Sequence, residues 1–75
     1  MENLFSTNMA INNENVNYRV FFDNENYVFQ SQSGKAFPTF SLKREHDEWH
    51  DQESVSPQLR QQAVNALEKY LLAQH

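Results

Sequence analysis

The amino-acid sequence predicts an α+β fold, in which an antiparallel β-meander of three to four strands is followed by one C-terminal α-helix packed on one face. Three observations support this prediction. Apolar residues recur at helical spacing over residues 56–74, apolar and polar residues alternate over residues 15–22, and eight of the ten aromatic residues lie between Tyr18 and Trp49. Aromatic residues favour strands, so this concentration indicates a packed sheet rather than a disordered chain.

The C-terminal stretch has both the start signal and the periodicity of an amphipathic helix. Ser56 can accept a hydrogen bond from a free backbone N–H at the helix start, and Pro57 suits the first helical position. No glycine or proline interrupts the residues that follow. The helix is expected to bury one apolar side, formed by Leu59, Ala63, Leu67, Tyr70 and Leu71, with Val64 on its flank.

Residues 15–22 predict a half-buried strand because apolar side chains occupy every second position. Asn24 and Glu25 follow as a two-residue hairpin turn, since Asn tolerates the positive φ that such a turn requires. This turn fixes a register in which the facing pairs share the core side of the sheet. The expected pairs are Val20 with Phe29 and Phe22 with Tyr27.

Residues 39–44 predict a third strand, which turns at His46-Asp47 or at Asp47-Glu48 into a short fourth strand. Either turn places Trp49 on the same face as Phe40 and Leu42. The helix would therefore pack against a sheet face made of Val16, Tyr18, Val20, Phe22, Phe29, Phe40, Leu42 and Trp49.

Residues 1–14 are expected to be an N-terminal segment, either a short strand or disordered, and residues 15–75 a single α+β domain. Leu4, Phe5, Met9 and Ile11 favour packing on a sheet, but the Ser, Thr and Asn residues between them favour a frayed terminus. A chain of 75 residues buries a small core, so no second domain is expected.

Composition makes several classes of function improbable. The formal charge of −4 opposes binding to nucleic acid, although Lys35, Lys43 and Arg44 could form a modest basic patch. The chain has no cysteine, no apolar run long enough to span a membrane and no secretory signal, so a cytoplasmic protein is expected. It carries no nucleophile signature and no phosphate loop, so we expect neither an enzyme nor a cofactor.

One stretch is chemically dense: Glu45-His46-Asp47-Glu48-Trp49-His50-Asp51. Imidazole and carboxylate groups bind divalent metals, so the alternative function is a small metal-binding domain. Its candidate ligands are His46, His50, Asp47 and Asp51. The predicted hairpin argues against that site, because it sends the two imidazole rings in different directions.

The main functional hypothesis is a non-enzymatic protein-interaction or structural module, either alone or as a homodimer. A single helix covers one side of the sheet, and Phe21, Val28 and Phe37 are expected on the other side. An exposed apolar cluster there would mark a contact with a partner protein or with a second copy. The alternative is that the N-terminal segment folds over it. Leu72, on the polar side of the helix, is a second candidate contact.

Overall fold

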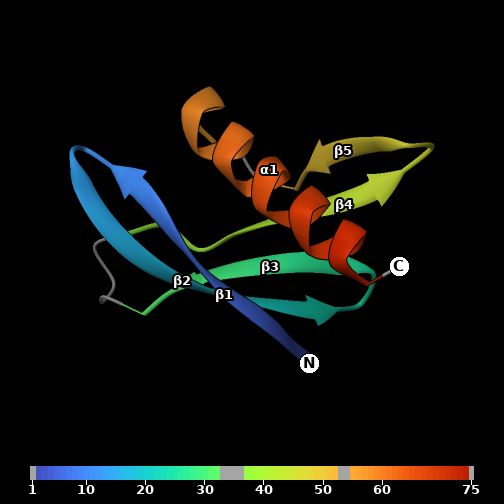
Figure 1. Cartoon of the computed structure of the whole chain (residues 1–75). Helices are drawn as coiled ribbons and strands as arrows, with labels where there is room; N and C mark the ends of the chain where they lie inside the picture. Colours follow the sequence, from blue (N-terminus) through green and yellow to red (C-terminus); the bar gives the residue numbers. More distant parts are fainter. Residues whose placement is uncertain (1, 33–36, 53–54, 75) are drawn as a thin grey trace.

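The computed structural model describes residues 2–32, 37–52 and 55–74. It confirms the α+β fold, an antiparallel meander with one C-terminal helix, but the sheet has five strands rather than three to four (Figure 1). The strands lie in chain order, and the elements are β1 (Glu2–Ile11), β2 (Glu14–Asp23), β3 (Asn26–Ser31), β4 (Phe40–Glu45), β5 (Glu48–Asp51) and α1 (Pro57–Ala73).

The additional strand is β1, which forms one edge of the sheet and pairs along most of its length with β2. The N-terminal residues are therefore part of the sheet. Met9 lies opposite Val16 and is 1% exposed, while a register shift between Asn3 and Phe5 marks a bulge near the start of the strand. The alternation was weak in the sequence because Thr7 occupies a core-facing position between Phe5 and Met9.

Three two-residue turns in the described part of the chain place non-glycine residues in the left-handed region. The predicted turn at Asn24-Glu25 is confirmed, with φ values of 54° and 69°, and so are the pairs Val20–Phe29 and Phe22–Tyr27. The β4–β5 turn is at His46-Asp47, the first of the two options, because Glu45 pairs with Glu48. Asn12-Asn13 forms a third such turn. Two left-handed residues give the backbone twist that matches the flanking strands.

The helix begins as the sequence predicts. Ser56 is the N-cap, its hydroxyl oxygen accepts a hydrogen bond from the Leu59 backbone N–H at 3.3 Å, and Pro57 is the first helical residue. Leu59, Ala63 and Leu67 are buried, and Val64 joins them although it was placed only on the flank. Tyr70 and Leu71 are half-buried near the C-terminal end.

The core lies between the helix and one face of the sheet. Its strand residues are Met9, Val16, Tyr18, Val20, Phe29, Phe40, Leu42 and Trp49. Stacked rings link the layers, since Phe5 on β1 contacts Tyr70 on α1 with ring centroids 4.7 Å apart. The prediction that Phe22 is also in this core is wrong: it is 36% exposed, because it lies at the end of β2 beside the hairpin turn, where its ring contacts Tyr27.

Tyr18 fixes the chain that leads into β4. Its side chain is fully buried, and its hydroxyl donates to the Pro38 carbonyl at 2.8 Å. Burial raises the pKa of the Tyr18 phenol above its ordinary value, because the charged form would lose its hydration. The phenol therefore remains a neutral donor, and it holds Pro38 next to the start of the strand.

The packing of the helix predicts that truncating two leucines five positions apart has different effects on the free energy of unfolding. Leu67→Ala should lower the free energy of unfolding by about 2–5 kcal/mol, because Leu67 is fully buried and its truncation leaves a cavity. Leu72→Ala is the matched control and should change it by less than about 0.5 kcal/mol, because Leu72 is 74% exposed. Urea unfolding followed by the fluorescence of the single tryptophan measures both. Equal losses would contradict the packing described here.

The positive φ angles of the turn residues predict that glycine at such a position makes the protein more stable than alanine does. At Glu25, with a φ of 69°, Glu25→Gly should be more stable than Glu25→Ala by about 1 kcal/mol, because alanine keeps the Cβ that opposes positive φ. The Glu25 side chain is exposed, so neither substitution removes core packing. Thermal unfolding of the two variants measures the difference. A more stable alanine variant would argue against this turn geometry.

Candidate functional site

The candidate site is the face of the sheet that turns away from α1, which we call the open face. Phe21 and Val28 are direct cross-strand partners between β2 and β3. Their neighbours Val20 and Phe29 are buried under the helix, so the pleat directs Phe21 and Val28 to the opposite side. Both side chains are half-buried, and in the described part of the chain no helix or second sheet packs over them (Figure 1).

The third residue predicted for this face lies elsewhere. Phe37 is half-buried and packs against the hydrophobic core, so the prediction that it joins Phe21 and Val28 is wrong. The reason is its place in the chain: it precedes Pro38, whose carbonyl is held by the buried Tyr18. Phe5, Met9 and Ile11 do not cover the open face either, because they pack on the core at the helix side of the sheet.

Polar and charged residues surround the apolar pair on the open face. Arg19 lies opposite Gln30 in the register next to Phe21 and Val28. Lys43 forms an ion pair with Glu45 at 3.5 Å. Among the described residues, Arg19 has no ion pair within 4 Å, so its guanidinium group is available to a carboxylate from outside. An apolar centre inside a polar rim is the usual anatomy of a protein-binding surface.

The structure separates the four candidate metal ligands. His46 and Asp47 occupy the β4–β5 turn, whereas His50 pairs with Lys43 on the open face. Asp51 lies toward the helix and accepts a hydrogen bond from Arg60 at 2.8 Å. Across residues 2–32, 37–52 and 55–74, no group of three or more His, Asp or Glu side chains is arranged to hold a metal ion.

The residues of the predicted basic patch are also divided. Lys43 lies on the open face, while Arg44 lies on the helix side with its guanidinium carbon 4.9 Å from the centroid of the Trp49 ring. Lys35 lies outside the described residues. The two cations that can be placed thus point to different sides of β4.

Side chains of the helix form hydrogen bonds to the backbone of both outer strands. On β1, Gln62 accepts from the Ala10 N–H at 2.8 Å and donates to the Ala10 carbonyl at 2.9 Å, as a neighbouring strand would. On β5, Arg60 donates to the Trp49 carbonyl at 2.7 Å and to Asp51. Free edge groups are templates for pairing with another chain, so these contacts reduce the tendency to associate edge to edge.

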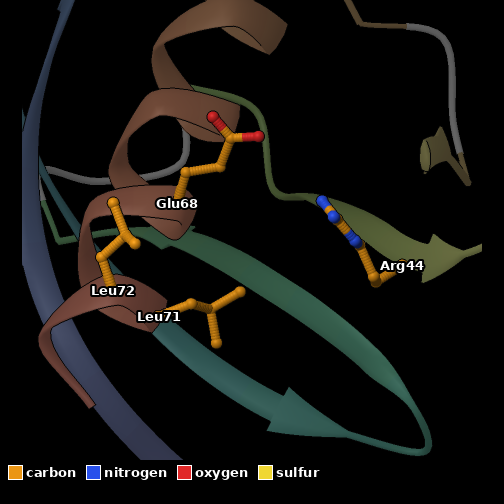
Figure 2. Close-up of a pocket in the computed structure, with 4 residues that line it drawn as sticks. All are labelled: Arg44, Glu68, Leu71 and Leu72. Atoms are coloured by element: carbon orange, nitrogen blue, oxygen red, sulfur yellow. The ribbon is translucent and has the colours of Figure 1, made fainter. Parts of the chain in front are cut away.

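A groove lies on the helix side of the molecule, between the C-terminal half of α1 and β4. It has a volume of about 340 Å³ and is lined by Arg44, Glu68, Leu71 and Leu72. Figure 2 shows the three helix residues on one stretch of α1 and the Arg44 side chain extending from β4 toward them. Sequence reasoning identified Leu72 as a candidate contact but missed the groove, because strand and helix spacing do not give the distance between the two elements.

Comparisons with protein-family models, with curated proteins and with solved structures found no match to this chain. Among the helices of the described residues, none is long and apolar enough to cross a membrane. The function must therefore be argued from the surfaces described above.

The hydrogen bonds of Gln62 to the edge of β1 predict that removing this side chain lowers the stability of the protein. Gln62→Ala should lower the free energy of unfolding by about 1 kcal/mol, because it removes both hydrogen bonds to Ala10. It should also increase concentration-dependent association, because the Ala10 backbone groups at the edge of β1 are then free. Gln61→Ala is the control, since Gln61 is exposed and donates a hydrogen bond to Asn65 one turn along the helix rather than to a strand. Denaturant unfolding and light scattering measure the two effects, and identical behaviour of both variants would refute the protective role.

Proposed function

We propose that this chain is a small, non-enzymatic protein-interaction module that binds a partner protein through the open face of its sheet. The observation that supports it is the Phe21–Val28 pair, which is half-buried among polar residues with no helix or second sheet over it in the described part of the chain. Apolar residues on the outer side of so small a sheet contribute little to its own core. A partner that covers them removes apolar surface from water, at about 25 cal/mol per Å².

The chemistry of the face indicates what the partner would present. An apolar side chain would pack on Phe21 and Val28, and a carboxylate beside it would meet Arg19, which has no ion pair among the described residues. Charged groups at such a rim contribute more to orientation and association rate than to affinity. The partner surface is thus expected to be apolar with an acidic neighbour. A location in the cytoplasm stays part of this proposal.

Hydrogen bonds at both edges of the sheet favour binding of a partner to the open face rather than to an edge strand. Many small β-proteins bind an extended peptide as an additional strand. Here Gln62 forms hydrogen bonds to the backbone of β1 at Ala10, and Arg60 donates one to the backbone of β5 at Trp49. Strand addition at these positions would have to displace these hydrogen bonds, whereas contact with the open face leaves them in place.

The proposal predicts that Phe21 serves binding rather than stability. Phe21→Arg should change the free energy of unfolding by less than about 1 kcal/mol, because the side chain lies outside the core. In an otherwise wild-type chain, a photoreactive phenylalanine at position 21 should crosslink one defined protein in the native cell. The control is the same amino acid at Asn17, on the same face of β2 and about 13 Å away.

Two results would overturn the proposal. One is a loss of several kcal/mol in Phe21→Arg, which would make Phe21 a structural residue. The other is the same crosslinking pattern at positions 17 and 21, because a specific surface must distinguish them. Retention of the crosslinked protein by wild type and its loss in Phe21→Arg would support the assignment.

A further inference from the structure

The groove between α1 and β4 carries the most exposed large apolar side chain of the described residues. Leu72 is 74% exposed, although it lies beside the half-buried Leu71 on a helix that buries Leu59, Ala63, Val64 and Leu67. Glu68, Leu71 and Leu72 have the spacing i, i+3 and i+4, so they form one continuous strip on the helix surface. This strip makes one wall of the groove, and Arg44 on β4 lies across from it (Figure 2).

The two charges of the groove are of opposite sign and are weakly engaged within the chain. Glu68 is exposed and forms no ion pair within 4 Å among the described residues. Arg44 lies over the Trp49 ring, and its one ion pair among the described residues is with the fully exposed carboxylate of Asp47, at 3.9 Å. An exposed pair at this distance contributes little, so both Glu68 and Arg44 can form contacts with another molecule.

We propose that a second copy of this chain occupies the groove, with the two copies related by a twofold axis. Such an interface uses the same surface on both partners, so it must be self-complementary. The groove meets that condition: Arg44 of one copy can face Glu68 of the other, and Glu68 of the first can face Arg44 of the second. Leu72 of each copy then packs against Leu71 of its partner, which removes the exposed apolar strip from water.

The position of the groove makes this interface independent of the open face. The groove lies on the helix side of the sheet, while Phe21 and Val28 lie on the opposite side. A dimer built through α1 would therefore leave two open faces directed outward. Two linked faces raise the effective concentration for a partner that carries two binding sites.

Sedimentation equilibrium and light scattering of the full chain over a range of concentrations test the proposal. Wild type should be a dimer in equilibrium with monomer, and Leu72→Glu should raise the dissociation constant by about tenfold or more, because a central apolar contact becomes a buried charge. Gln58→Glu adds the same charge to the exposed start of the helix and should leave the dissociation constant unchanged. Wild type that remains monomeric at about 1 mM, or equal effects of the two variants, would overturn the proposal.

Charge reversal tests the specific pairing between copies. Arg44→Glu and Glu68→Arg should each weaken the dimer, because like charges then meet across the twofold axis. The double variant should regain most of the affinity, since each pair is again of opposite sign. Failure of the double variant to recover would reject this interface even if another dimer exists. Phe21→Arg should leave the dimer intact, so this result is distinguishable from failure of the open-face proposal.

Discussion

The structure depends on a sheet that curves around a single helix and is held to it at both edges. Gln62 binds the backbone of β1 and Arg60 binds β5, although the two residues are only two positions apart in the chain. Two positions correspond to about 200° around a helix, so these side chains point to nearly opposite sides of α1. One turn of helix therefore bridges the first and last strands, and the aromatic core is enclosed between them.

This arrangement compensates for the small size of the chain. A single helix is narrow, and a flat five-stranded sheet would extend beyond it on both sides. Curvature brings the outer strands to the helix, so that Met9 on β1 and Trp49 on β5 share one buried cluster. The bulge near the start of β1 is consistent with this shape, because bulges bend a strand and increase its twist.

The same arrangement determines which surfaces remain for other molecules. The helix covers one face of the sheet, and its side chains hydrogen-bond to backbone groups at both edges. The apolar residues that can contact another molecule are therefore those that the helix does not cover. Apart from Phe22 at the end of β2, the described residues offer two such places on opposite sides of the molecule: Phe21 with Val28 on the open face, and Leu72 beside Leu71 at the groove. One is a flat surface with a polar rim, and the other is a concave strip with paired opposite charges. These properties fit a hetero-partner and a second copy, respectively.

Local sequence determined most of the fold. Ser56-Pro57 marks the helix start, the two-residue turn at Asn24-Glu25 sets the register of β2 and β3, and alternation places Val28 and Phe21 on one face. These features depend on neighbours within a few residues, which is why they can be read from the chain. Tertiary structure decided what depends on distant segments: whether residues 2–11 pair with β2, whether Phe37 is drawn to the core, and whether Phe22 is covered. The groove belongs to the second group, because it arises from the spacing between Arg44 and a helix that begins 13 residues later.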